Sequence, residues 1–147
     1  MQVVLASAWI AAGSTGCANK PSDRDLVLVS PDEAMRIVQE GTKKYVVLGK
    51  QTGVWVDSRS EADYRQEHIH GAINLPYERV TEDHKLLDKY EILVVYGNDY
   101  NDARANGMSK RLMALGHGDV RTLNGGLRAW KSQGNPVETA NGSEPRP

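Results

Sequence analysis

The sequence predicts an α/β domain with a central, mostly parallel sheet and helices on both faces. Apolar runs typical of strands alternate along the chain with segments of helical periodicity. One run, residues 92–96, has five apolar residues without alternation, as is typical of a strand buried on both faces of a parallel sheet. With 147 residues, 39% hydrophobic and 25% charged, the chain has room for one folded domain.

The first half of the chain begins with a predicted strand over residues 26–29. Ser30 then supplies an N-cap and Pro31 the first position of a helix, which we expect to end at Gly41. Apolar runs at residues 45–48 and 54–56 are separated by a glycine-containing turn and predict a hairpin.

In the second half we expect a short polar helix over residues 60–66 and a buried strand over residues 92–96. Residues 104–115 form the clearest helix, with one apolar stripe and Gly116 at its end. A strand over residues 120–123 and a helix over residues 127–133 follow, and residues 138–147 are expected to be a flexible tail.

Charge and cysteine content exclude several classes of protein. Lys and Arg number 18 and Asp and Glu 19, so the net charge is −1. Nucleic-acid binding requires clustered positive charge, and we therefore expect no nucleic-acid partner. The single cysteine, Cys17, excludes an intramolecular disulfide and a multi-cysteine metal site. No apolar run reaches the roughly 20 residues that a membrane-spanning helix needs.

The amino-terminal residues have the layout of an export signal. Residues 1–19 carry no charged side chain, and a short apolar stretch is followed by small residues and Cys17. The ending over residues 14–17 resembles a bacterial lipobox, although Ser14 stands where an aliphatic residue is usual and no basic residue precedes the apolar stretch. The resemblance implies lipidation of Cys17, a signal over residues 1–17, a tether over residues 18–24 and a membrane-anchored location in the cell envelope. The alternative is an incidental apolar leader.

Two stretches carry a family resemblance. Residues 56–76 read VDSRSEADYRQEHIHGAINLP, and residues 123–130 read LNGGLRAW. Together they resemble the two signatures of rhodanese-like domains. This resemblance implies a three-layer rhodanese-like α/β fold over residues 25–137. It also implies a chemistry of sulfur transfer, in which a cysteine after the central strand carries sulfur as a persulfide.

The loop that should hold this cysteine differs from the family pattern C-x-x-G-x-R-S. In the aligned positions the chain has Gly97, Asn98, Asp99, Tyr100, Asn101, Asp102 and Ala103. Gly97 stands at the cysteine position and Tyr100 at the glycine position. Asp102 replaces the arginine and Ala103 the serine. Glycine offers no nucleophile, and the two carboxylates would repel an anionic sulfur donor. We therefore predict a degenerate loop without a catalytic residue.

The resemblance implies that Asp57 and Arg59 flank the pocket. A structural interpretation is also open, in which Asp57 caps the following turn and Arg59 pairs with a carboxylate such as Asp63. His68 and His70 are two positions apart and could chelate a metal, but His68 matches a family position that usually serves as a scaffold hydrogen-bonder. The glycine pair at residues 125–126 is expected to permit a tight strand-to-helix turn.

The polar side chains of the loop have two interpretations. Asn98, Asp99, Asn101 and Asp102 place four oxygen-bearing side chains in five residues, which could bind a hard cation such as Ca²⁺. The alternative is a solvated loop that caps the helix beginning near Arg104. We predict no metal site and no cofactor.

Two functions remain open from the sequence. The favoured prediction is a non-catalytic rhodanese-like domain that serves as a binding or scaffold module for an unidentified protein partner in the cell envelope. The alternative is a divergent sulfurtransferase that acts on thiosulfate or a persulfide through a non-standard site in the same cleft.

Overall fold

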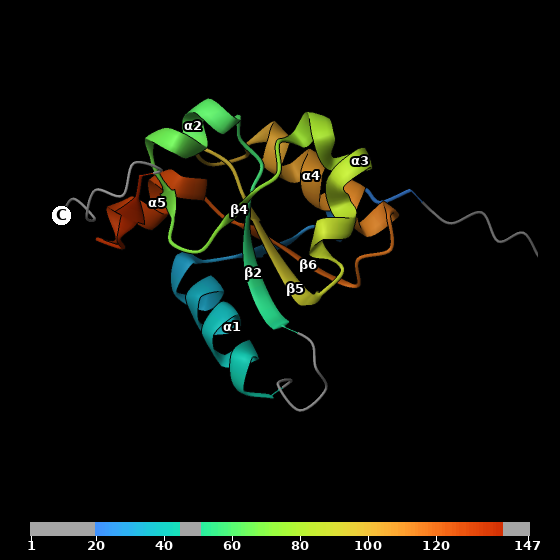
Figure 1. The fold of residues 1–147 in the computed structure, drawn as a ribbon, viewed down its shortest axis with the longest axis horizontal. Helices are drawn as coiled ribbons and strands as arrows, with labels where there is room; N and C mark the ends of the chain where they lie inside the picture. The colour runs from blue at the N-terminus through green and yellow to red at the C-terminus, as the bar shows by residue number, and fades with distance from the viewer. Residues whose placement is uncertain (1–19, 45–50, 140–147) are drawn as a thin grey trace, which may run out of the picture.

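The computed structural model describes residues 20–44 and 51–139 and contains a five-stranded sheet between helices (Figure 1). The strand order is β1-β6-β5-β2-β4, and every pairing in this sheet is parallel. A separate two-stranded sheet pairs β3 with β7 in antiparallel orientation. The predicted α/β class is confirmed.

The strands of the two sheets are β1 (Val27–Val29), β2 (Gln51–Asp57), β3 (His68–Ile69), β4 (Ile73–Asn74), β5 (Tyr90–Tyr96), β6 (Asp119–Leu123) and β7 (Val137–Glu138). The α-helices are α1 (Pro31–Lys44), α2 (Glu61–Gln66), α3 (Val80–Asp83), α4 (Ala103–Ala114) and α5 (Gly126–Ser132). Short 3₁₀ turns are η1 (Asp23–Asp25), η3 (Tyr77–Arg79) and η4 (His84–Leu87).

Strand β5 supplies alternate side chains to two cores. Leu93 and Val95 belong to the core that α3 and α4 cover, whereas Val94 and Tyr96 belong to the core that α1 and α5 cover. All four residues are at most 1% exposed. Successive side chains of a strand point to opposite faces, so a strand between two helical layers must be apolar at every position. This explains the unalternating run in the sequence.

The predicted helices form, with small shifts at their ends. Ser30 caps α1 as expected, because its hydroxyl accepts the N–H of Glu33 at 3.3 Å. Helix α1 continues to Lys44 instead of ending at Gly41, since an internal glycine weakens a helix by only about 1 kcal/mol and need not stop it. Helix α4 begins at Ala103, one residue before the prediction, because Asp102 is its N-cap.

The closing signature packs against the second core. Trp130 is 4% exposed, and its ring meets Trp55 edge-on with centroids 5.0 Å apart. Its indole N–H donates to the carbonyl of Pro136 at 2.8 Å. Trp130 is therefore part of the core that α1 and α5 cover.

Both ends of the domain extend further than the sequence predicted. The last two residues of the expected tether, Asp23 and Arg24, belong to η1, and Asp23 pairs with Lys110 of α4 at 2.6 Å. At the other end Glu138, expected to begin a flexible tail, belongs to β7. A two-residue strand has no periodicity for a sequence pattern to show, which explains this miss.

Several predictions fall on residues outside the described part of the chain. These are the first strand of the hairpin at 45–48, the signal with Cys17, and the tail from residue 140. Within residues 20–44 and 51–139, no helix is long and apolar enough to cross a membrane.

Candidate functional site

The loop between β5 and α4 lies at the carboxyl end of the central strand, where parallel α/β sheets place their sites. It comprises residues 97–102, which are six of the seven positions aligned with the rhodanese loop pattern. Asn101 adopts a left-handed conformation, with φ of 56°. Asparagine tolerates this conformation better than most residues, so the loop can curl without a glycine at this point.

The carboxylate of Asp102 fills the inside of this loop. One oxygen, Oδ2, accepts the backbone N–H of Asn98 at 2.8 Å. The other, Oδ1, accepts the N–H groups of Arg104 and Ala105 at 2.9 and 3.1 Å. Three backbone donors therefore converge on one carboxylate, which is the arrangement that loops and helix N-termini offer to a bound anion.

Gly97 lies directly beside this carboxylate. A Cβ atom at residue 97 would lie 2.4 Å from Cγ of Asp102 and 2.5 Å from its Oδ2. No side chain fits at residue 97 while Asp102 keeps its position. The two substitutions, glycine for cysteine at residue 97 and aspartate for arginine at residue 102, are therefore linked, because the position of Asp102 requires glycine at residue 97.

Helix α5 holds the loop from the other side. The N–H groups of Leu127 and Arg128 donate to the carbonyls of Gly97 and Asn98, both at 2.9 Å. Gly126 makes this approach possible, because a Cβ there would lie 2.5 Å from the carbonyl oxygen of Gly97. Its φ of +54° also favours glycine. The expected tight turn with close packing is present.

Asp99 and Tyr100 lie at the outer rim of the loop. Asp99 is 3.8 Å from Nη1 of Arg128, and its side chain is 49% exposed. The guanidinium of Arg128 lies over the Tyr100 ring, 5.5 Å from its centroid. The two carboxylates of the loop therefore differ in role, since Asp102 faces the backbone donors and Asp99 the solvent. This contact pattern favours the capping interpretation of the loop over cation binding.

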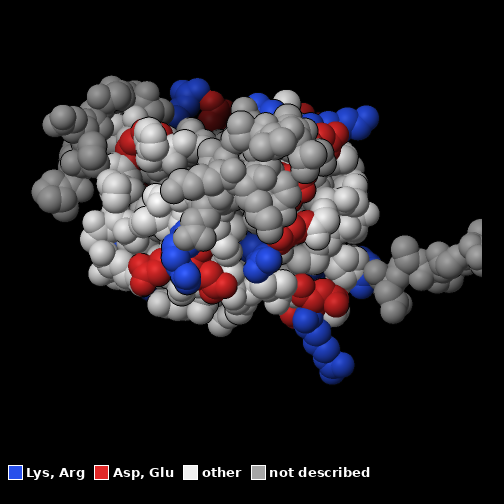
Figure 2. All heavy atoms as spheres, turned by 90° about the horizontal axis from the view of Figure 1, so that it is seen from below, with Lys and Arg blue, Asp and Glu red and all other residues white. Residues whose placement is uncertain are grey.

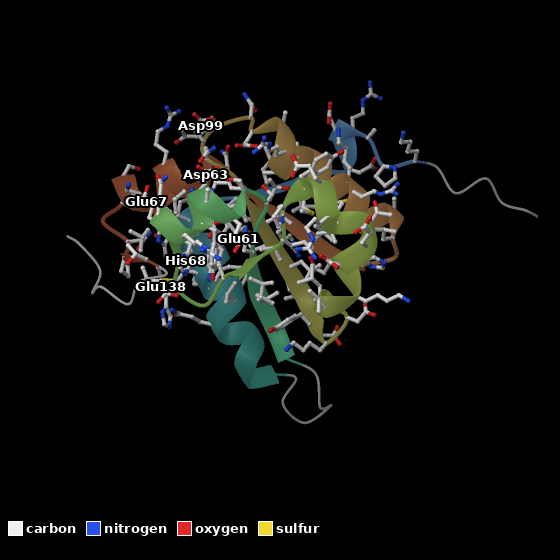
Figure 3. All side chains as sticks on the ribbon, turned by 45° about the horizontal axis from the view of Figure 1, so that its top comes forward. Glu61, Asp63, Glu67, His68, Asp99 and Glu138 are labelled. Atoms are coloured by element: carbon white, nitrogen blue, oxygen red, sulfur yellow. The ribbon has the colours of Figure 1, made fainter. Side chains whose placement is uncertain are left out.

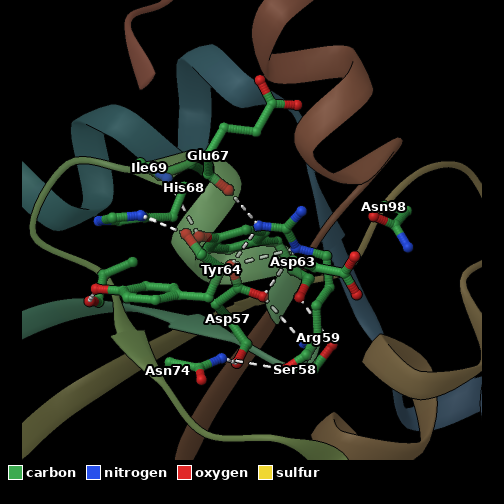
Figure 4. Close-up of polar contacts among 12 residues, drawn as sticks. Asp57, Ser58, Arg59, Asp63, Tyr64, Glu67, His68, Ile69, Asn74 and Asn98 are labelled. Atoms are coloured by element: carbon green, nitrogen blue, oxygen red, sulfur yellow. Dashed lines mark hydrogen bonds and ion pairs between the residues drawn. The ribbon is translucent and has the colours of Figure 1, made fainter. Parts of the chain in front are cut away.

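Asp57 and Arg59 form a buried ion pair at the end of β2, beside the loop (Figure 4). Nη2 and Nε of Arg59 donate to the Asp57 carboxylate at 2.7 and 3.0 Å, and the side chains are 4% and 0% exposed. Asp57 also accepts the N–H of Arg59 at 2.9 Å, as the turn-capping interpretation predicted. Arg59 thus pairs with a carboxylate, as that interpretation expected, but the partner is Asp57 and not Asp63, which accepts the hydroxyl of Ser60.

The Asp57 carboxylate of this pair affects the pKa of Arg59 itself and that of the neighbouring Tyr96. Burial alone would lower the pKa of Arg59, but the hydrogen bonds and charge of Asp57 outweigh it and raise the pKa. Burial raises the pKa of Tyr96 far above its ordinary value, and the Asp57 carboxylate adds to the rise. The phenol therefore stays neutral, and its oxygen accepts the N–H of Ile69 at 3.2 Å. Arg59 therefore stays charged and Tyr96 stays neutral.

A cavity of about 170 Å³ lies between this pair and α5. It is lined by Arg59, Glu67, Asn98, Leu127, Arg128 and Lys131. Each of its three cations already has a carboxylate neighbour, because Lys131 pairs with Glu67 at 2.7 Å and the others pair as described above. Of the two residues predicted to flank the pocket, Arg59 lines this cavity, whereas Asp57 is fully buried.

Charge is also mixed elsewhere on the surface. On the face shown in Figure 2, acidic and basic side chains lie interspersed without a broad region of one sign. This view agrees with the net charge of −1.

The two histidines of the first signature serve as hydrogen-bonding scaffold residues. His68 is buried, with Nδ1 2.8 Å from the carbonyl of Tyr64 and Nε2 3.1 Å from Glu138 (Figure 3). Nδ1 of His70 lies 2.7 Å from the second oxygen of Glu138. The hydrogen bond from His70 lowers the pKa of Glu138, and the N–H of Gly71 adds to this effect. The scaffold interpretation of His68 is confirmed.

Sequence reasoning identified the loop, the residues Asp57 and Arg59, and the glycine pair. It did not predict that Asp57 and Arg59 pair with each other, and it missed Glu138. That residue is 70 positions from His68, and no local pattern links the two. The sequence left capping of the helix open as one interpretation of this loop, but only the folded loop shows that Asp102 is the residue that caps α4.

Comparison with known proteins identifies the family. Residues 31–133 match the Rhodanese-like domain family. Thiosulfate sulfurtransferase PspE from Escherichia coli (strain K12) is 35% identical over 77 residues, which cover 50% of this chain and 70% of that protein. Thiosulfate sulfurtransferase GlpE from Pseudomonas fluorescens is 33% identical over 99 residues, covering 65% and 85%.

A solved structure, the BH2092 protein from Bacillus halodurans, has a TM-score of 0.62 at 20% identity and covers 77% of each chain. At this identity the likeness supports the fold alone. The family match extends over both signatures and the loop between them. The chain therefore belongs to the rhodanese-like domain family.

Proposed function

We propose that this domain is a non-catalytic rhodanese-like module that binds a protein partner in the cell envelope. The observation that carries the proposal is the Asp102 carboxylate, which accepts three backbone N–H groups inside the loop. Because these donors are already bonded to the chain's own carboxylate, they do not offer a binding site for an anionic sulfur donor at the same place.

Steric and electrostatic effects both act against sulfur transfer in this loop. Persulfide chemistry requires a thiolate, and the single cysteine of the chain is Cys17. A cysteine at residue 97 would collide with Asp102. A unit negative charge brought to about 4 Å from that carboxylate would be repelled by about 4 kcal/mol at an effective dielectric constant of 20, and a thiosulfate anion carries two such charges.

A divergent sulfurtransferase is the second candidate. It is supported by relatives named as thiosulfate sulfurtransferases and by the cavity between Arg59 and α5, which has three cations in its lining. The ion pairs at these cations reduce the positive charge available to a substrate. We therefore rank it below the binding module.

The first test is a thiosulfate:cyanide sulfurtransferase assay on the chain carrying Cys17→Ser, beside an active rhodanese. The serine variant removes the only thiol, so any turnover must come from another group. We expect no thiocyanate above the uncatalysed background. Turnover above background would overturn the non-catalytic proposal and favour the divergent enzyme.

The proposed location depends on Cys17 as a lipidated residue. In the native host, Cys17→Ser should move the protein from the membrane fraction to a soluble fraction, and mass spectrometry should find a lipid on the unchanged chain. Ala18→Ser is a control that keeps the cysteine. Equal membrane association of both variants would contradict the anchor. In that case the search for the partner, by crosslinking in envelope extracts, would have to include both the membrane and the soluble fraction.

A further inference from the structure

A second polar cluster lies at the opposite edge of the central sheet. His84 begins η4, Asp88 follows η4, and His117 lies between α4 and β6. Strands β5 and β6 begin directly after these residues, at Tyr90 and Asp119. Because β5 spans seven residues, about 20 Å separates this cluster from the loop at residues 97–102. The cluster is therefore independent of the sulfur-transfer region and of the proposed function.

The three donor atoms already converge. Nδ1 of His84 and Nε2 of His117 are 3.2 Å apart, and Oδ1 of Asp88 is 3.9 Å from the same Nε2. All three ligand atoms lie within 4.8 Å of one another. Two nitrogens bound to one tetrahedral Zn²⁺ at 2.0–2.1 Å would be about 3.3 Å apart, so the imidazole pair has the required spacing.

The folded backbone fixes both histidines. Helix α4 ends in a Schellman motif, in which Gly116 donates to the carbonyl of Met113 and His117 donates to that of Leu112, both at 3.1 Å. The His117 side chain is only 9% exposed. His84 is half-buried at the start of η4, whose last residue, Leu87, is fully buried. The two nitrogen ligands are thus positioned before any ion arrives.

The third ligand is free to adjust. The Asp88 side chain is 63% exposed, and its backbone N–H is bonded to the carbonyl of Lys85 at 3.2 Å. A small rotation of this exposed side chain can shorten the 3.9 Å distance between Oδ1 of Asp88 and Nε2 of His117 to the spacing of two ligands on one ion. Two imidazoles with one carboxylate form a donor set that suits Zn²⁺ and related transition metals, whereas Ca²⁺ and Mg²⁺ prefer oxygen ligands alone.

We propose that His84, Asp88 and His117 bind a divalent transition metal of the Zn²⁺ class, with one coordination position left to water. Among the described residues this is the group of three potential ligands whose donor atoms converge. The metal would join the segment after α3 to the turn after α4, two segments separated by 33 residues in the sequence. That separation explains why the sequence predicted no metal site.

The test is a calorimetric titration of the full chain with ZnCl₂, without a histidine tag and with Cys17→Ser to remove the thiol. We expect one Zn²⁺ per chain and a higher thermal unfolding midpoint with Zn²⁺ but not with MgCl₂. His84→Gln and His117→Gln should each weaken binding at least tenfold, and Asp88→Asn should weaken it less. Circular dichroism without metal checks that each variant folds.

His70→Gln is the matched control, because His70 is an exposed histidine beside a carboxylate elsewhere on the molecule. Its Zn²⁺ affinity should equal that of the parent. Co²⁺ provides a second readout, since tetrahedral coordination gives a strong visible absorption that His84→Gln should abolish. The proposal would be overturned if the chain did not bind Zn²⁺, or if both His84→Gln and His117→Gln left the binding unchanged. The imidazoles would then share only a hydrogen bond.

Discussion

The loop before α4 and the turn before α5 lie against each other at one edge of the sheet, yet they retain the family pattern to different degrees. The turn has the glycine pair at residues 125–126 that the resemblance predicted, whereas the loop has none of the four expected residues. Two hydrogen bonds of 2.9 Å nevertheless join α5 to the carbonyls of Gly97 and Asn98. The backbone contacts between the loop and α5, which we call the frame of the site, therefore form even though the catalytic side chains of the family pattern are absent.

Different forces hold the two regions. The turn depends on close packing, because nothing larger than a hydrogen fits at Gly126. The loop depends on one carboxylate, Asp102, and its three N–H donors. The buried Asp57–Arg59 pair lies beside both regions at the end of β2, where Arg59 lines the same cavity as Asn98 and Leu127. Substitutions in each place should therefore have effects of different size and kind.

The largest effect is expected from Arg59→Met. This change leaves the carboxylate of Asp57 buried without its partner, which should lower the free energy of unfolding by about 3–5 kcal/mol in urea denaturation. The double variant Asp57→Asn with Arg59→Met removes the charge as well and should recover part of the loss. A single variant within 1 kcal/mol of the parent would show that the pair does not support the retained frame.

The next effect tests the packing of the turn. Gly126→Ala should destabilise the fold by about 3 kcal/mol, because it combines a left-handed backbone with a clash against the carbonyl of Gly97. Gly134→Ala is a matched control, with φ of +75° but open space around its Cβ, and should lose only about 1 kcal/mol. Equal losses in the two variants would mean that close packing of α5 on the loop is unimportant.

A smaller effect is expected at the loop itself. Asp102→Ala removes the cap of α4 and should lower the free energy of unfolding by about 1–2 kcal/mol. Asp99→Ala, at the exposed rim, should stay within about 0.5 kcal/mol of the parent. If Asp99→Ala lost more stability than Asp102→Ala in thermal or chemical unfolding, the roles assigned to the two carboxylates would be reversed.

The smallest effect is a pH dependence at the β3–β7 pair. The folded-state pKa of Glu138 lies below its ordinary value of 4.5, so its contribution is complete above pH 4.5 and is lost as pH falls through the lower, folded-state pKa. Because the side chain is 35% exposed, the contribution should be below about 1 kcal/mol. Between pH 6 and pH 3.5 the parent should lose more stability than Glu138→Gln.

An exposed glutamate provides the control for that measurement. Glu78 is 62% exposed and 3.8 Å from Arg104, so Glu78→Gln should keep the acid dependence of the parent. If Glu138→Gln showed the same acid dependence as the parent, the bridge to His68 and His70 would contribute nothing.

Much of the fold follows from the sequence, because its elements have local signals. The run over residues 92–96 and the Ser30 cap both form as predicted. The contacts that the sequence could not show join distant residues, such as Glu138 with His68 and His84 with His117. Asp102 is an intermediate case, since it is local in sequence but its orientation into the loop depends on the left-handed Asn101.

The central claim is that the Asp102 carboxylate and a cysteine at residue 97 exclude each other. The most direct measurement compares thiosulfate:cyanide turnover of two variants in the Cys17→Ser background. One carries Gly97→Cys alone, and the other adds Tyr100→Gly, Asp102→Arg and Ala103→Ser. Asp102 should displace the new thiol in the single variant, and its charge should raise the pKa of that thiol. We expect sulfur transfer by the variant with four substitutions and none by the variant with Gly97→Cys alone. Equal turnover by both variants, or turnover by the Cys17→Ser chain itself, would contradict it.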